Sequence, residues 1–189
     1  MGINLRYIDA GGGLGISYNG DLVPGPDEYA RQVCKSLDFP DIEIIFEPGR
    51  SLVGNAGILI SRVLFVKDTP EKKFYICDAA MNDLARPALS DAYHAIEAAD
   101  AGARPLTADV VGPICETGDF LARDRALPAL ERGERIAVLG TGAYGFVMAS
   151  NYNTRPRVVE VMVDGDKVHQ VRRRETVAEL FAGEQVLPT

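Results

Sequence analysis

Apolar and polar positions follow two different patterns along this chain, and the change falls near residue 58. In the first part, residues 7–9 and residues 42–46 form short apolar runs that are typical of buried strands. Between them, residues 27–37 place apolar side chains at positions i, i+4 and i+8 just after Pro26, which predicts a helix. This strand–helix–strand order indicates the parallel sheet or barrel of an α/β protein.

The second part contains strand-like segments with no long helical pattern between them. Asp164-Gly165-Asp166 separates two of these segments, and such a turn is a strong hairpin signal. The pattern therefore predicts a mostly antiparallel β domain, sandwich-like or barrel-like. Its strand candidates are residues 58–67, 73–78, 107–111, 135–139, 157–163 and 167–172.

Residues 176–185 at the end of the chain predict a short helix. Thr176 is a suitable N-cap, and Glu179 three residues later completes a capping box.

The first part cannot form a domain by itself. Two parallel strands and one helix bury no core, and a complete α/β barrel needs eight strand–helix units in about 250 residues. Either another chain completes this part, or the chain is a piece of a longer protein.

Composition and charge exclude several classes of protein. The 189 residues are 47% apolar and 25% charged, which is typical of globular proteins and not of disordered ones. The net charge of −7 argues against nucleic-acid binding. No apolar run approaches the roughly 20 residues of a membrane span, and the start lacks the pattern of a signal peptide. Three cysteines form no closed disulfide framework, so we expect a cytoplasmic protein. Two histidines, far apart in the sequence, indicate no metal site.

Two loops follow the first two strands, where α/β proteins bind ligands. Gly11-Gly12-Gly13 would let backbone amides approach a phosphate, although an ordinary tight turn has the same composition. Glu47-Pro48-Gly49-Arg50 would suit a charged ligand, although it is equally consistent with a surface turn that holds an ion pair.

Two further positions carry chemistry in loops. Cys115 lies among Pro, Gly and polar residues beside Glu116, which makes it a candidate acid or nucleophile. Most free cysteines are simply small buried apolar residues, and Cys34 and Cys77 fit that description better. Tyr144 stands among small residues after a predicted strand and could contact a ligand or belong to the core.

Taken together and in this order, the motifs are much more specific than any one of them. The chain resembles, over essentially its whole length, the C-terminal half of the diaminopimelate decarboxylase family, pyridoxal-phosphate enzymes of the alanine-racemase-like group (group IV decarboxylases). The stretches that carry the resemblance are Asp9–Gly15, Phe46–Arg50, Asp78–Leu89, Gly112–Asp119, Gly142–Gly145, Asn151–Arg157 and Arg172–Thr176.

The resemblance implies a fold and a division of the chain. Residues 1–57 would be the last elements of a TIM-type (β/α)8 barrel that binds pyridoxal 5'-phosphate. Residues 58–175 would form the C-terminal β domain, and residues 176–189 a helix and tail. The family's Schiff-base lysine lies before the point at which this chain begins, so we expect the chain alone to be inactive.

The resemblance also implies a role for each site residue. Cys115 would be the catalytic proton donor, in a loop that reaches the partner subunit's site in a homodimer. The cofactor-binding residues would be Gly12, Gly13, Glu47, Pro48, Gly49, Arg50 and Tyr144. The substrate-binding residues would be Arg50, Arg86, Ser90, Glu116 and Tyr144.

One position departs from the family pattern. Four residues after Arg86 the family usually has a tyrosine, but this chain has Ser90, with Tyr93 nearby.

The resemblance implies that the intact protein decarboxylates meso-2,6-diaminopimelate to L-lysine and CO₂. The alternatives are a related decarboxylase of ornithine, arginine or carboxynorspermidine, and a non-catalytic fragment or partner domain.

Overall fold

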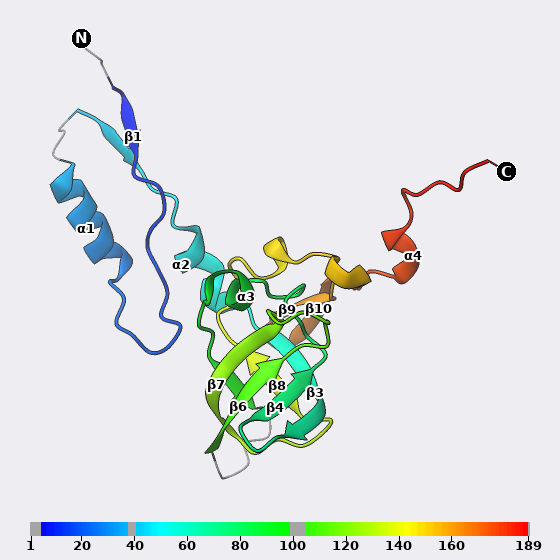
Figure 1. The fold of residues 1–189 in the computed structure, drawn as a ribbon. Coiled ribbons are helices and arrows are strands. Elements are labelled where there is room, and N and C mark those ends of the chain that lie inside the picture. The colour runs from blue at the N-terminus through cyan, green and yellow to red at the C-terminus, as the bar shows by residue number, and fades with distance from the viewer. Residues whose placement is uncertain (1–4, 38–40, 99–104, 189) are drawn as a thin grey trace.

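The first described part of the chain is a small parallel unit. A computed structural model describes residues 5–37, 41–98 and 105–188. Strands β1 (Tyr7–Asp9) and β2 (Glu43–Ile45) pair in parallel, with Ile8 opposite Ile44. Helix α1 (Pro26–Ser36) connects them, and the whole unit extends away from the rest of the molecule (Figure 1). The predicted strand–helix–strand order and the parallel pairing are confirmed.

The local sequence explains why α1 begins and ends where it does. Pro26 occupies the first turn, where its missing N–H costs no hydrogen bond. Asp27 and Glu28 in the first turn and Lys35 in the last turn complement the helix dipole. No residue of α1 is fully buried in this chain, although the Tyr29 ring packs against Phe46, with ring centroids 5.9 Å apart.

The main body is a six-stranded sheet in the order β5-β8-β3-β4-β6-β7. Only β4 and β6 run parallel, and the other neighbours are antiparallel, as the sequence predicted. The two outer strands, β5 and β7, contact each other, so the sheet curls into a nearly closed barrel (Figure 1). Its strands are β3 (Leu59–Asp68), β4 (Lys73–Cys77), β5 (Ile96–Ala98), β6 (Pro105–Val111), β7 (Phe120–Pro128) and β8 (Arg135–Val138).

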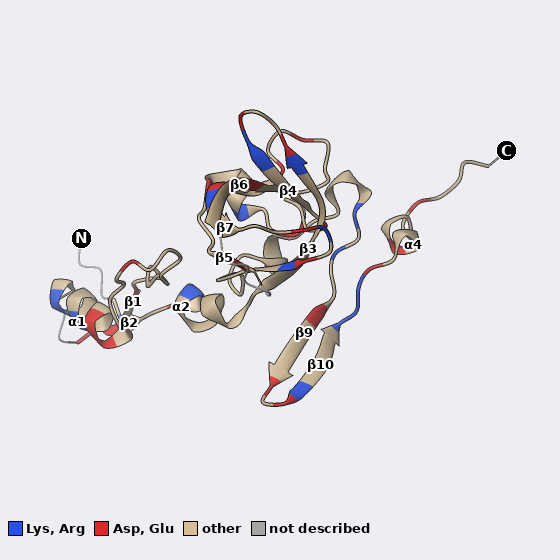
Figure 2. Cartoon of the chain, turned by 90° about the horizontal axis from the view of Figure 1, so that it is seen from below, with Lys and Arg blue, Asp and Glu red and all other residues tan. Residues whose placement is uncertain are grey.

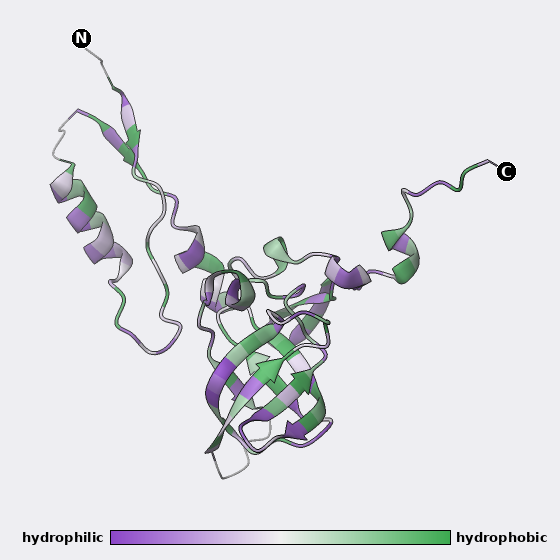
Figure 3. Cartoon of the chain, in the orientation of Figure 1, coloured by the Kyte–Doolittle hydropathy of each residue, from purple (hydrophilic) through white to green (hydrophobic). Residues whose placement is uncertain are grey.

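Apolar side chains from these strands fill the interior of the barrel. Val63, Tyr75, Val110 and Val138 are fully buried. Burial of each such side chain stabilises the fold by about 1.5–3 kcal/mol. The Tyr75 hydroxyl donates to the Pro128 carbonyl (3.2 Å) and accepts from the Leu130 amide (3.0 Å), so its one polar atom is satisfied. Figure 3 shows the same concentration of apolar residues in the barrel strands.

Strand β7 was not predicted from the sequence. Its middle reads Arg-Asp-Arg, which interrupts the apolar alternation, and Asp124 has a positive φ of 46°. The pairing with β6 shifts register twice along its length, so bulges allow charged residues inside a strand.

The β9–β10 hairpin is a separate two-stranded sheet. Strands β9 (Glu160–Asp164) and β10 (Lys167–Arg172) pair antiparallel across the predicted turn and project from the barrel (Figure 2). The predicted strand start at residue 157 was wrong. The Arg157 amide donates to the Glu175 carboxylate (2.8 Å) rather than to a ladder, so pairing begins three residues later.

The C-terminal helix is shorter than predicted. Helix α4 covers Val177–Leu180 only, although the Thr176 capping box with Glu179 is present. No residue of α4 is buried, and a helix of one turn gains little without packing. In the part of the chain that the structure describes, no helix is long and apolar enough to cross a membrane.

Candidate active site

The two loops that follow β1 and β2 meet at one edge of the small parallel sheet. Parallel strands bring their carboxyl ends to the same edge, so the segments after Asp9 and Ile45 are neighbours. The Glu47 amide donates to the Gly11 carbonyl (2.8 Å), and the Tyr29 hydroxyl donates to the Gly12 carbonyl. The predicted glycine loop and the Glu47–Arg50 loop therefore form one structure.

Gly12 is required by this close approach. A Cβ atom at position 12 would lie 2.8 Å from the Glu47 carbonyl oxygen, which is closer than real side chains come. The backbone amides of Gly12 and Gly13 donate to no acceptor among the described residues. Two free amides on a loop without side chains are suited to an anion such as a phosphate.

The predicted turn at Pro48-Gly49 is the start of a short helix. Helix α2 (Gly49–Val53) begins directly after Pro48 and continues into the 3₁₀ turn η1 (Gly54–Ala56). The earlier expectation of a simple loop through Arg50 was wrong, because the residues after Pro48 adopt helical backbone angles.

Backbone contacts join this turn to the loop that carries Tyr144. The Gly142 amide donates to the Gly54 carbonyl (3.0 Å), and a Cβ at position 142 would overlap the Val53 carbonyl oxygen. This packing places the Arg50 guanidinium over the Tyr144 ring, 5.3 Å from its centroid. The structure thus brings together Arg50 and Tyr144, two predicted site residues that lie far apart in the chain.

Tyr144 adopts an unusual backbone conformation. Its φ is +60°, a left-handed angle that costs a non-glycine residue about 1–2 kcal/mol. The side chain is 45% exposed, so the strain is not offset by burial in the core. Such strained, exposed aromatic residues are found at functional sites, and the interpretation of Tyr144 as a core residue is not supported.

Arg86 starts helix α3 (Arg86–Ser90) in a second group of residues beside the barrel. Its guanidinium lies over the Tyr18 ring, 4.9 Å from the centroid, and donates to His94 Nε2 (3.1 Å). Ser90, at the other end of α3, is exposed and donates its hydroxyl to the Arg86 carbonyl (3.1 Å).

The loop with Cys115 and Glu116 is held by Asp119. The buried Asp119 carboxylate accepts the Met81 and Ile114 amides, each at 2.7 Å. Both Cys115 and Glu116 are exposed at the tip of this loop. Among the described residues, no hydrogen bond, ion pair or ring contact connects them with Arg50 and Tyr144.

The surroundings of Cys77 and Cys115 agree with the expectation from the sequence, whereas those of Cys34 do not. Cys77 is buried, which raises the pKa of its thiol to about 12, and Cys115 is exposed. Cys34 was expected to be a small buried residue, but it is exposed in this chain. Cys34 lies outside the half-buried face of α1, which carries Tyr29 and Val33.

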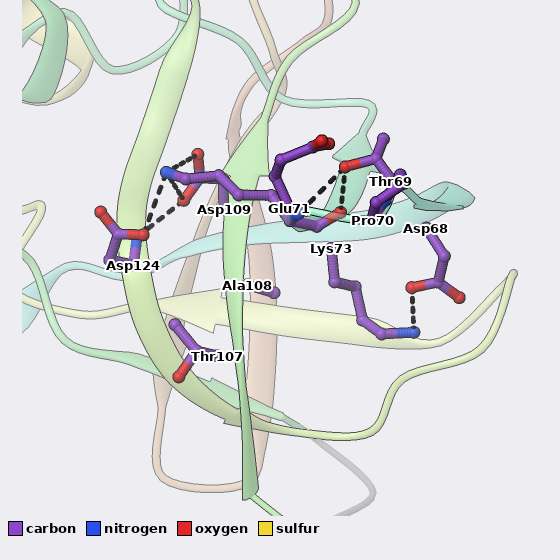
Figure 4. A pocket seen from close by; sticks show the side chains of 10 residues that line it. Asp68, Thr69, Pro70, Glu71, Lys73, Thr107, Ala108, Asp109 and Asp124 are labelled. Carbon is purple, nitrogen blue, oxygen red and sulfur yellow. Dashed lines mark hydrogen bonds and ion pairs between the residues drawn. The ribbon is translucent and has the colours of Figure 1, made fainter.

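A depression in the described residues lies elsewhere, beside the β3–β4 turn (Figure 4). Lys72 crosses it and pairs with Asp109 and Asp124, each at 3.0 Å. The hydrogen bonds that Lys72 donates to Asp124 and Asp109 raise its pKa. A lysine held in its charged form between two carboxylates is a poor nucleophile. The described residues include no cluster of His, Cys, Asp and Glu that could hold a metal ion.

Sequence reasoning missed the residues that support the site. Tyr29, Tyr18 and His94 carry no local motif, and their roles depend on contacts between segments far apart in the chain. Asp119 was part of a quoted motif, but nothing in the sequence indicated that its carboxylate binds the loop backbone.

Comparison with known proteins identifies the class to which this arrangement belongs. The family model for pyridoxal-dependent decarboxylases, C-terminal sheet domain, matches residues 16–142, and the chain belongs to this family. The match begins well before residue 58, so it crosses the expected boundary between the two parts of the chain.

The individual relatives are diaminopimelate decarboxylases. That of Pseudomonas aeruginosa is 55% identical over 99% of this chain and 45% of its own length. The crystal structure of the Helicobacter pylori enzyme complexed with L-lysine is 43% identical, with a TM-score of 0.87, over 95% of this chain and 44% of that chain. The crystal structure of the M. jannaschii enzyme in co-complex with L-lysine is 38% identical, with a TM-score of 0.90, over 98% of this chain and 44% of that chain. The expected resemblance to the C-terminal half of these enzymes is confirmed, and the chain spans less than half of their length.

Proposed function

We propose that this chain is the C-terminal part of a pyridoxal-phosphate-dependent enzyme that decarboxylates meso-2,6-diaminopimelate to L-lysine and CO₂. The observation that carries the proposal is the junction of the Gly12 loop, Glu47, Arg50 and Tyr144, in a chain so similar to diaminopimelate decarboxylases. In this proposal, residues 1–57 are the last elements of a TIM-type barrel and residues 58–175 the β domain.

The residues of this site are suited to hold the cofactor. The free amides of Gly12 and Gly13 would hold its phosphate, with Pro48 and Gly49 shaping the adjoining turn. Glu47 would bind the protonated pyridine nitrogen, and Tyr144 would contact the ring. When bound, pyridoxal phosphate supplies the electron sink for loss of the carboxylate.

The remaining residues would bind the substrate and supply a proton. Arg50 and Arg86 would bind carboxylates, for which a planar guanidinium is well suited, and Glu116 would bind the distal ammonium group. Cys115 would donate a proton to the α-carbon after CO₂ has left. Because Cys115 is exposed and lacks contacts to Arg50, we propose that it serves the site of the partner in a cytoplasmic homodimer.

The decisive measurement is CO₂ release from meso-diaminopimelate by the complete enzyme and by this chain alone, both with pyridoxal phosphate supplied. We expect turnover only in the complete enzyme, because the chain lacks a lysine suited to bind the cofactor. The DNA immediately upstream should encode a barrel half in frame. Turnover by the isolated chain at a comparable rate would contradict the proposal.

The shared site has its own test. Complete enzyme with Cys115→Ala and complete enzyme with Arg50→Ala should both be nearly inactive. Mixing them under conditions of subunit exchange should restore activity, because one of the two sites in the mixed dimer then has both residues. Failure to restore activity despite proven exchange would place both residues in one subunit.

Ser90 favours a second candidate function. Where the family usually has a tyrosine, this chain has a short exposed side chain that bonds back to Arg86. The second candidate function is therefore decarboxylation of a related substrate such as ornithine, arginine or carboxynorspermidine. Competition between meso-diaminopimelate and each of these at the complete enzyme, compared as kcat/KM, decides between the two functions.

A further inference from the structure

We propose that His94 is a positioning residue for Arg86: it accepts a hydrogen bond from the guanidinium and thereby fixes its orientation toward a substrate carboxylate. This inference rests on the role of Arg86 in the proposed function and adds a residue that no motif assigned. It follows from a cluster of the buried His94 with the half-buried Arg86 and Tyr18 and the Leu139 carbonyl, which we call the Arg86 support.

The hydrogen bonds of the Arg86 support define the form of the histidine. His94 is fully buried, with Nδ1 2.9 Å from the Leu139 carbonyl and Nε2 3.1 Å from Arg86 Nη1. A carbonyl can only accept, so Nδ1 carries the proton. Nε2 is then unprotonated and carries a lone pair, with which it accepts a hydrogen bond from the guanidinium, a group that can only donate. The two neighbours therefore select the neutral Nδ1–H tautomer.

The charged groups around His94 oppose a second proton on the ring. Arg86 faces it from α3, and Arg125 of β7 donates to the His94 carbonyl (2.9 Å). The other two neighbours, the Tyr18 ring at 5.1 Å and the Leu139 carbonyl, are uncharged. Burial, with the charges of Arg86 and Arg125, lowers the pKa of His94, while the Leu139 hydrogen bond opposes this shift.

Arg86 has no acidic partner among the described residues, unlike the arginines of the chain that form ion pairs. Arg155, Arg157, Arg172 and Arg173 each pair with a carboxylate. In the described residues Arg86 has only an aromatic face and a neutral imidazole beside it. One N–H is used by His94, and the others of its five are left for an anion.

This arrangement orients the guanidinium without neutralising it. A carboxylate partner from the protein would also hold the side chain, but it would compete with a carboxylate ligand for the same charge. A neutral acceptor on one side and a π-face on the other fix the plane of the guanidinium and preserve its attraction for an anion. Half-burial of Arg86 strengthens that attraction.

The test uses two substitutions, each of which removes one of the two hydrogen bonds of the imidazole and keeps the other. In His94→Asn the amide can still donate to Leu139, but the acceptor for Arg86 is lost. In His94→Gln the amide oxygen can still accept from Arg86, but the donor to Leu139 is lost. In the complete enzyme we expect His94→Asn to raise KM for meso-diaminopimelate about ten- to hundredfold, with kcat per cofactor-loaded site little changed. His94→Gln should restore most of the loss.

Arg86→Lys separates this inference from the proposed function. If Arg86→Lys leaves KM unchanged, Arg86 does not bind substrate, and the positioning role of His94 falls with that assignment. If Arg86→Lys raises KM and His94→Asn does not, only the positioning role is overturned. Equal losses in His94→Asn and His94→Gln would also overturn it, because a merely structural histidine would not distinguish them.

A second readout does not depend on activity. The chain has two histidines, His94 and His169, so nitrogen-15 NMR of the imidazoles is readily assigned with a His169→Gln variant. We expect His94 in the neutral Nδ1–H form at pH 7, and a changed Nε2 shift in Arg86→Lys. An Nε2–H tautomer would overturn the proposal.

Discussion

At the scale of single residues, solvent exposure distinguishes the candidate reactive side chains from the side chains that only pack in the core. Cys77 is enclosed by the barrel, whereas Cys115 lies at the tip of a loop fixed from below by Asp119. Tyr144 shows the same distinction, because its left-handed backbone and exposed ring have no packing explanation. Residue type alone did not make these differences visible.

Cys115→Ala should slow the complete enzyme while leaving its fold and cofactor content nearly intact. A positioned acid typically contributes about 10²- to 10⁴-fold in rate, and we expect a loss of that size. The matched control is Cys34→Ala, which should change the free energy of unfolding by less than about 0.5 kcal/mol, since Cys34 is exposed in this chain. The measurement is steady-state decarboxylation normalised to bound cofactor. Nearly full activity in Cys115→Ala would reduce the loop to substrate binding through Glu116.

At the scale of elements, the loop after β6 depends on one buried carboxylate. Asp119 accepts the Met81 and Ile114 amides, and Gly112 leaves room for it, because a Cβ there would lie 2.4 Å from Asp119 Oδ2. The element is thus a rigid support for an exposed tip rather than a free loop.

Asp119→Ala should therefore destabilise the fold by about 3 kcal/mol, since it removes two hydrogen bonds to a charged acceptor and leaves two amides without a partner. Glu116→Ala is the control in the same loop: its carboxylate is exposed and binds only the Gly118 amide (3.2 Å), so stability should hardly change. Urea unfolding of both variants measures the difference. Equal, small effects would show that the loop does not depend on Asp119.

The two sheets should also differ in stability. Ile45 of β2 is 38% exposed, whereas Tyr75 of β4 is fully buried among barrel strands. In dilute chain we expect the amides of β4 to exchange with solvent far more slowly than those of β2. Equal protection of β2 and β4 would mean that the parallel unit is stable by itself.

At the scale of the whole molecule, the described chain consists of one barrel with a filled apolar core and of two smaller parts that bury few side chains of their own. The parallel unit and the β9–β10 hairpin project from it, and both carry exposed apolar side chains (Figures 1 and 3). Both projecting parts leave apolar surface in water, and strand β3 of the barrel also exposes Ile60 and Phe65.

Global stability should fall on acidification through the buried histidine. The pKa of His94 is lowered in the folded chain, so the unfolded chain binds this proton first as the pH drops below the ordinary histidine pKa of about 6.5. The effect is absent above that pH, grows by at most about 1.4 kcal/mol per pH unit, and stops once the pH passes the folded pKa. His94→Gln lacks it, so its stability deficit relative to the unmodified chain should shrink between pH 7.5 and pH 5. A pH-independent difference, measured by urea unfolding, would contradict this.

Local sequence determined the features that depend on neighbouring residues. The strand–helix–strand order, the Asp164–Asp166 hairpin and the Thr176 capping box were all predicted, because periodicity and turn chemistry act over a few residues. The motifs in order also carried the family resemblance. Errors fell where long-range contacts override local preference, as in β7 and in the first residues of the predicted β9 segment.

The tertiary structure alone decided which distant side chains share surroundings. The pairing of Arg50 with Tyr144 requires glycine backbones to meet between α2 and the loop after β8. The Arg86 support requires three further segments, carrying Tyr18, His94 and Leu139, to close around one guanidinium. No local pattern encodes such meetings, because they result from how the parallel unit and the barrel pack together and not from the preferences of any single segment.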